Sequence, residues 1–150
     1  TVHEVAKELD SNGLHLAFLD PHNLETLEFS IIERLATFKH IDIIVHFSVS
    51  DETRNWDTYI DSPRSALDTF APGWRTKVDV MRGRRVGRRK LFEYWCSLVS
   101  GIGLNVSKVV HEVKNQRRVP LYWLLLLSRH PLPEKLWSTT SGNKQGELFV

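Results

Sequence analysis

Three apolar runs dominate the hydrophobic pattern of this chain. LHLAFL (14–19), IDIIVHF (41–47) and VPLYWLLLLS (119–128) are short and bounded by polar residues or proline, which is typical of buried strands. Between the first two runs, at about 28–38, apolar positions follow helical spacing. A strand, a helix and a strand in this order form a βαβ unit, so we expect the first two strands to be parallel.

The end of the chain predicts an antiparallel hairpin. An alternating run at 106–113 precedes the 119–128 run, and a short polar link that includes the four residues 115–118 joins them. A parallel pair needs a crossover, so a link this short favours antiparallel pairing. We expect the longer run to lie between its hairpin partner and the 41–47 strand, because its lack of alternation predicts that both of its faces are covered.

Helices are predicted elsewhere from apolar spacing and end signals. The strongest stripe lies at 88–100, and a short one lies at 2–9. A loop is expected after the second strand, followed by a helix at 62–70 in which Ser62 is the N-cap and Pro63 takes the first position. Gly83 and Gly87 predict a flexible segment before the 88–100 helix. A domain of 1–138, closed by a short helix near Leu136-Trp137, and a tail of 139–150 complete the expected organisation.

This order of elements predicts an α/β fold of a particular kind. A mostly parallel sheet that ends in an antiparallel hairpin is characteristic of Rossmann-like methyltransferases. Residues 14–128 would form the C-terminal half of such a sheet, with two parallel strands followed by the hairpin. No glycine-rich loop follows an early strand, although that loop holds the cofactor in this architecture. The cofactor-binding residues are therefore unknown, and we expect the chain by itself to be inactive.

Four segments resemble the three-Cys-motif partner proteins (TcmP). They are LHLAFLDPHNLETLEFSIIERLA, then IDIIVHFS with Arg54-Asn55 shortly after, then PLYWLLLLSRHPLPEKLW, and the final GELFV. The resemblance covers about residues 9–149. It implies a methyltransferase-like fold and S-adenosylmethionine as the cofactor of a complete protein. It also implies a genomic association with a three-cysteine-motif protein.

Charge and cysteine content refine this interpretation. The formal net charge is only +2, yet the segment from Lys77 to Lys90 holds seven basic residues and one acidic residue. Flexible glycines and arginines suit phosphate binding, and an aromatic ring can stack on a base. The predicted nucleic-acid contacts are Trp74, Lys77, Arg82, Arg84, Arg85, Arg88, Arg89 and Lys90.

Cys96 is the only cysteine, so an internal disulfide is excluded and a cytoplasmic location is expected. No apolar run has membrane-spanning length, and no histidine spacing predicts a metal site.

The candidate catalytic residues are Asp20, Pro21, His22 and Asn23, at the end of the first strand. This tetrapeptide resembles the D/N-P-P-Y/F turn of amino-group methyltransferases, in which the acceptor NH2 donates hydrogen bonds to the turn. The alternative is a simple strand-ending turn, because Asp, Pro and Asn are good turn formers. His46 ends the second strand at the same edge. It is either an acid or base or a structural residue bonded to the backbone.

Two functions follow from these patterns. The first is a methyltransferase-like protein of the TcmP type that acts on nucleic acid, with Asp20–Asn23 at the acceptor group. The alternative is a non-enzymatic module that binds nucleic acid or a protein through residues 77–90. In either case the apolar edge of the 14–19 strand is expected to be covered by a protein partner, by self-association or by the 2–9 helix.

Overall fold

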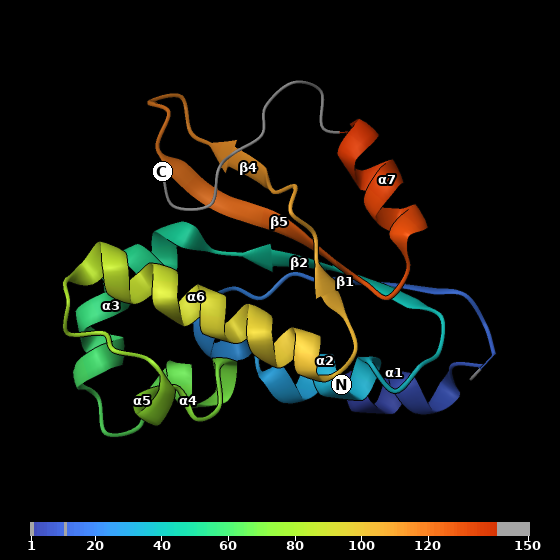
Figure 1. The fold of residues 1–150 in the computed structure, drawn as a ribbon, viewed down its shortest axis with the longest axis horizontal. Helices are drawn as coiled ribbons and strands as arrows, with labels where there is room; N and C mark the ends of the chain where they lie inside the picture. The colour runs from blue at the N-terminus through green and yellow to red at the C-terminus, as the bar shows by residue number, and fades with distance from the viewer. Residues whose placement is uncertain (1, 11, 141–150) are drawn as a thin grey trace.

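The fold was obtained as a computed structural model, and it describes residues 2–10 and 12–140. The elements in chain order are α1 (Val2–Glu8), β1 (His15–Leu19), the 3-10 helix η1 (Leu24–Thr26), α2 (Phe29–Leu35), β2 (Ile41–Phe47), α3 (Val49–Asp61), α4 (Ala66–Phe70), α5 (Trp74–Lys77), α6 (Arg84–Gly101), β3 (Asn105–Val106), β4 (His111–Lys114), β5 (Pro120–Ser128) and α7 (Pro131–Thr140). Figure 1 shows them as an open sheet with most helices on one side.

The sheet has the strand order expected from the sequence. β1 pairs with β2 in parallel, and β5 pairs antiparallel with β2 on one side and with β3 and β4 on the other. The parallel pair, the antiparallel hairpin and the central place of the longest apolar run are thereby confirmed. The fold is mixed α/β with an open five-stranded sheet.

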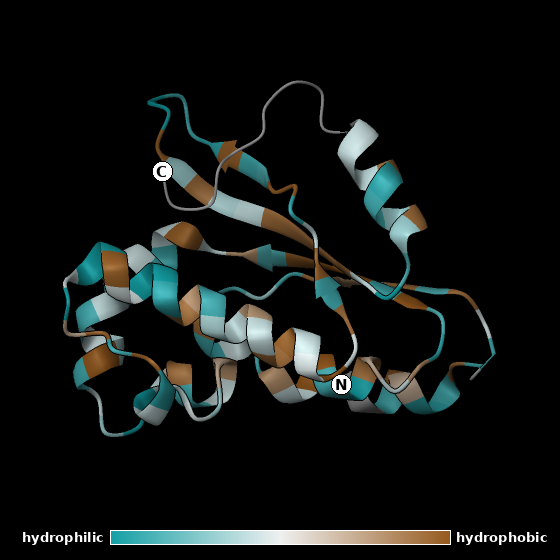
Figure 2. Cartoon of the chain, in the orientation of Figure 1, coloured by the Kyte–Doolittle hydropathy of each residue, from teal (hydrophilic) through white to brown (hydrophobic). Residues whose placement is uncertain are grey.

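The core lies between the sheet and the helices below it in Figure 1. The residues of β2 alternate between buried and half-buried, and its buried set, from Ile41 to Phe47, faces those helices. An aromatic cluster fills the centre: Phe47 lies 5.7 Å from Phe70 and from Phe92, and Trp95 stacks on Phe70 at 5.5 Å between ring centroids. Figure 2 shows the matching hydropathy, with brown along the strands and teal at the turn between β4 and β5.

The opposite face of the sheet carries only α7 among the described elements. This helix packs against β5, and the ring of its Trp137 lies 4.3 Å from that of His111. The indole N–H of Trp137 donates to the carbonyl of Val109 at 2.9 Å. The expected short terminal helix is therefore present, and it runs through Thr140. The rest of the expected tail, residues 141–150, lies outside the described residues.

The segment after β2 differs from the sequence-based expectation. The expected loop is the 13-residue helix α3, capped by Ser48, whose side chain accepts from the N–H of Asp51. Ser62 ends this helix instead of starting the next one, and Ser65 is the N-cap of α4. The predicted helix start at Ser62-Pro63 was wrong because an equivalent cap lies three residues further on.

The glycines before the strongest helical stripe also act differently from the prediction. The helix α6 starts at Arg84, so Gly87 lies inside it, and Gly83 with φ +100° is its N-cap. A Cβ on Gly87 would lie 2.9 Å from the Trp56 ring and 3.0 Å from the carbonyl oxygen of Val80. Gly87 therefore permits close packing of α6 on α3 rather than flexibility.

Two further elements are shorter than expected. The alternating run at 106–113 is broken into β3 and β4, both paired with β5. The helix expected at 2–9 is α1, which ends at Glu8. It packs against α2, and together with β1 it lines an apolar hollow on the helix-covered side of the sheet. It adds no strand to β1, which remains at the end of the described sheet.

Candidate functional site at the carboxyl edge of the sheet

The parallel pair brings two candidate residues together. In the register of β1 and β2, Leu19 lies opposite Val45, so the next residue, Asp20, lies beside His46. Nδ1 of His46 is 2.6 Å from Oδ1 of Asp20, although the contact lies outside hydrogen-bond geometry. The sequence placed these residues at one edge but did not predict their contact.

Both ring nitrogens of His46 are buried and have no hydrogen-bond partner among the described residues. Its ring meets the Tyr122 ring edge to face at 4.2 Å between centroids. The neighbouring Asp20 carboxylate is largely exposed, with 65% of its side-chain surface accessible.

The turn after β1 is held in place by a residue that sequence reasoning missed. The carboxylate of Asp51, in the first turn of α3, accepts from the N–H of Leu24 at 3.1 Å. It also accepts from the amide of Asn55 at 2.8 Å and from the hydroxyl of Tyr59 at 2.9 Å. Burial and the neighbouring carboxylate raise the pKa of Tyr59 to about 12, so this hydroxyl remains a donor. The spacing Ser48-x-x-Asp51 is a capping signal that could have identified this helix start.

The four residues of the tetrapeptide Asp20–Asn23 have different surroundings. Asn23 caps η1, because its side chain accepts from the N–H of Thr26 at 3.1 Å. Pro21 is half-buried and His22 is exposed. Of the four predicted catalytic residues, Asp20 is the one whose side chain forms an ion-pair contact with the imidazole of His46. The other three shape the turn or lie at its surface.

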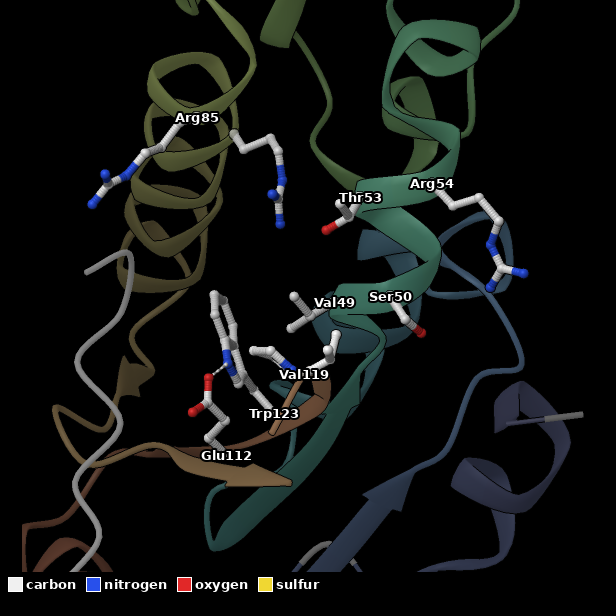
Figure 3. A pocket seen from close by; sticks show the side chains of 10 residues that line it. Val49, Ser50, Thr53, Arg54, Arg85, Glu112, Val119 and Trp123 are labelled. Atoms are coloured by element: carbon white, nitrogen blue, oxygen red, sulfur yellow. Dashed lines mark hydrogen bonds between the residues drawn. The ribbon is translucent and has the colours of Figure 1, made fainter. Parts of the chain in front are cut away.

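A cavity of about 480 Å³ opens at the same end of the sheet, between the first turns of α3 and α6 and the start of β5. Figure 3 shows Val49 and Thr53 pointing from α3 toward this space, and Ser50 and Arg54 of the same helix also line it. Trp123 forms one wall, and its indole N–H donates to Glu112 at 3.3 Å. The cavity thus combines apolar walls with hydroxyl and guanidinium groups.

A buried ion pair fixes the two helices beside the cavity. Nε and one terminal nitrogen of Arg88 lie 2.6 and 2.5 Å from Oε2 of Glu52, whose side chain is 3% exposed. Burial raises the pKa of Glu52, while the hydrogen bond and charge of Arg88 oppose that rise. Arg88 therefore joins α6 to α3 and is already occupied by a carboxylate.

The remaining basic segment is mostly at the surface and partly paired. Exposed acids lie near three of its arginines: Arg82 with Asp79 at 3.0 Å, Arg84 with Asp57 at 3.1 Å, and Arg89 with Glu93 at 3.7 Å. Lys77 and Arg85 are exposed, and Lys90 is half-buried. Exposed pairs of this kind contribute about 0–1 kcal/mol each, so a phosphate can replace the carboxylate.

Trp74 lies in a different environment from these cations. Its side chain is 3% exposed, its indole N–H donates to Asp68 at 2.8 Å, and the guanidinium of Arg75 lies 4.6 Å from its ring centroid. The ring is part of the core and offers no free face to a base in this structure. Of the eight predicted nucleic-acid contacts, Trp74 and Arg88 thus have structural roles.

Three further features of the described residues concern metal binding, thiol chemistry and membrane spanning. Among residues 2–10 and 12–140, no group of three or more His, Cys, Asp or Glu side chains could hold a metal ion. Burial, with a smaller effect of Glu93, raises the pKa of Cys96 to about 12, so its thiolate is scarce at neutral pH. None of the helices in that part of the chain is both long and apolar enough to cross a membrane.

One end of the molecule, where the parallel strands have their carboxyl ends, therefore holds the Asp20–His46 contact, the cavity and the basic start of α6 (Figure 1). Comparison of the chain with family models, with curated proteins and with solved structures gives no match in any of the three.

Proposed function

We propose that this chain is the acceptor-binding part of a methyltransferase-like protein of the TcmP type, with nucleic acid as the acceptor. The observation that carries the proposal is the strand order. A parallel pair, β1 and β2, is followed by β5 inserted antiparallel before β3 and β4. The last strands of Rossmann-like methyltransferases have this order, and ligands of such sheets bind beyond the carboxyl ends of the strands.

The acceptor would bind at Asp20 and His46. A carboxylate accepts hydrogen bonds from an exocyclic amino group, and it does so with high specificity when it is ionised. His46 lies against that carboxylate, and its buried Nε2 has no partner among the described residues. A flipped or unpaired base would therefore meet the exposed Asp20 carboxylate as its hydrogen-bond acceptor, with His46 behind that carboxylate.

The methyl donor in this proposal is S-adenosylmethionine, held mostly by residues outside those described. No glycine lies in the described turns that directly follow β1 and β2, where a backbone must approach such a cofactor closely. We therefore expect the 150-residue chain to bind S-adenosylmethionine more weakly than micromolar in calorimetry. Tighter binding would contradict this assignment of the cofactor site.

The acceptor site can be tested without the cofactor. A single-stranded oligonucleotide with unpaired adenines and cytosines is titrated into the isotope-labelled chain, and backbone amide signals are followed by NMR. We expect shifts at residues 19–24 and 46–48, and their loss in Asp20→Ala. Glu33→Ala, which removes an exposed carboxylate from α2, is the matched control and should behave as wild type.

A second candidate function is a non-enzymatic nucleic-acid-binding module. The observation that favours it is the exposed set Arg82, Arg84 and Arg89, whose carboxylate partners are also exposed. In the same titration this function predicts shifts confined to residues 77–90 and an unchanged response in Asp20→Ala. That result would overturn the acceptor-site proposal.

A further inference from the structure

The outer edge of β1 carries unpaired backbone groups. The N–H of His15 donates to the carbonyl of His40 at 2.8 Å, toward β2. Because successive residues of a strand point their backbone groups to opposite sides, those of Leu16 and Phe18 point to the outer edge. In the sheet formed by residues 2–10 and 12–140, no strand pairs with that edge.

Apolar side chains surround this edge on both faces of the sheet. Leu14, Leu16 and Phe18 are 88%, 68% and 59% exposed. On one face an apolar hollow of about 620 Å³ joins β1 to Leu132 and Leu136 of α7. On the other face a hollow of about 430 Å³ lies between β1 and α1.

The size of this patch is that of an interface. The exposed parts of Val5, Leu14, Leu16, Phe18, Leu132 and Leu136 amount to roughly 700 Å², above the ~300–600 Å² of the largest patch on a typical monomer. Two such patches together would bury roughly 1,400 Å², within the ~1,200–2,000 Å² of a stable interface. Free edges are usually guarded by lysine, proline or a bulge, and β1 (HLAFL) has no lysine or proline.

We infer that this edge binds a second copy of the chain, β1 against β1, in an antiparallel pair around a twofold axis. A register centred on Ala17 places Leu16 opposite Phe18 of the second copy, and both residues have outward backbone groups. Each such pair exchanges two hydrogen bonds, and the symmetry gives two pairs. The smallest side chain of the strand then lies on the axis, and the two sheets become continuous. The inference concerns this chain by itself and does not rest on the proposed function; in a complete methyltransferase-like sheet, strands of the other half would take this edge instead of the second copy.

Oligomeric state and amide exchange test the inference together. Light scattering after size exclusion, from micromolar to millimolar chain, should show a concentration-dependent species of twice the monomer mass. Hydrogen exchange should slow at the amides of Leu16 and Phe18 as the dimer forms. The amides of Ala17 and Leu19, which point to β2, should change little.

Two variants address different parts of the contact. Leu16→Pro removes an outward N–H without removing a bond to β2, and Phe18→Lys places a charge in the interface. Each should weaken dimerisation by about tenfold or more. Met81→Lys, at a residue that is 85% exposed and outside the patch, is the control and should dimerise as wild type. Circular dichroism establishes that each variant is folded.

Three results would overturn the inference. They are a monomer over the whole concentration range, a dimer unaffected by Phe18→Lys in a folded chain, and fast exchange at Leu16 and Phe18 in the dimer. A monomer with fast exchange at both amides would leave the edge to a strand from a different polypeptide.

Discussion

Replacing Arg88 by Met would leave the carboxylate of Glu52 buried without its cation. Glu52 is 3% exposed, and the two nitrogens of Arg88 that contact it both approach the same oxygen, Oε2. Methionine preserves the aliphatic length of the side chain, so the main change is the loss of charge and hydrogen bonds. Removing one partner of a buried ion pair costs about 3–5 kcal/mol, because the remaining charge is uncompensated. We expect Arg88→Met to lower the free energy of unfolding by about that amount at neutral pH.

The loss should depend on pH in a defined direction. Burial raises the pKa of Glu52 above its ordinary value of 4.5, against the lowering effect of Arg88. The folded chain therefore holds this proton more tightly than the unfolded chain. The stability contributed by such a group is fully present below the ordinary value and is lost as pH rises through the raised, folded-state pKa. Without Arg88 that pKa rises further, so the penalty of the variant grows from acid toward neutral pH.

Urea unfolding of wild type and variant at several pH values between about 5 and 7 measures this difference. The double variant Glu52→Gln, Arg88→Met removes the buried charge and should recover about 2 kcal/mol or more at neutral pH. Arg84→Met is the matched control. It breaks a pair whose side chains are 56% and 69% exposed, and it should cost less than about 1 kcal/mol. A loss below about 1 kcal/mol in Arg88→Met, or one independent of pH, would refute the assignment of a buried, paired Glu52.

Three further predictions concern other parts of the chain. Gly87→Ala should lower the free energy of unfolding by about 1–3 kcal/mol, because a Cβ there would lie 2.9 Å from an indole ring and 3.0 Å from a carbonyl oxygen. Gly101→Ala, in the same helix with open space around it, should be neutral or stabilising by up to about 1 kcal/mol in the same urea titration. Cys96 should react with a thiol reagent slowly in the native chain and fast in denaturant, since burial raises the pKa of its thiol to about 12. A fast reaction in the native chain would contradict the burial of this thiol. If the basic segment binds nucleic acid, a plot of log affinity against log salt concentration should have a slope of roughly −2 to −4. Replacing Arg84 and Arg89 by Ala should make that slope shallower by about 1.5. An unchanged slope would show that these two arginines do not contact the nucleic acid.

Local patterns determined much of the framework. The three apolar runs become β1, β2 and β5, because short bounded stretches of buried side chains have few alternatives to a strand. Short links fixed the direction of pairing at the hairpin, and the helix between the first two runs fixed the parallel pair. The stripe at 88–100 lies in α6 for the same reason, since its spacing matches one face of a helix.

The helix α3 shows where local pattern was insufficient. Its sequence, VSDETRNWDTYID, has few apolar positions and several residues with poor intrinsic helix propensity. The partners that stabilise this helix lie elsewhere in the chain. The carboxylate of Asp51 accepts a hydrogen bond from the backbone N–H of Leu24, and Glu52 pairs with Arg88, 36 residues away. Only the cap at Ser48 was readable locally.

The sequence by itself determined which residues reach the carboxyl edge, because each strand's end follows from its own pattern. Only the tertiary structure decided which of them meet. Asp20 and His46 are in contact because the parallel register aligns them on one face of the sheet, and a shift of one residue would place them on opposite faces. Trp74 and Arg88 were both read from the sequence as surface groups, but Trp74 is buried and bonded to Asp68, and Arg88 is half-buried and paired with Glu52. The partner of Arg88 lies 36 residues away in the chain, and hydrophobic periodicity carries no information about either partner.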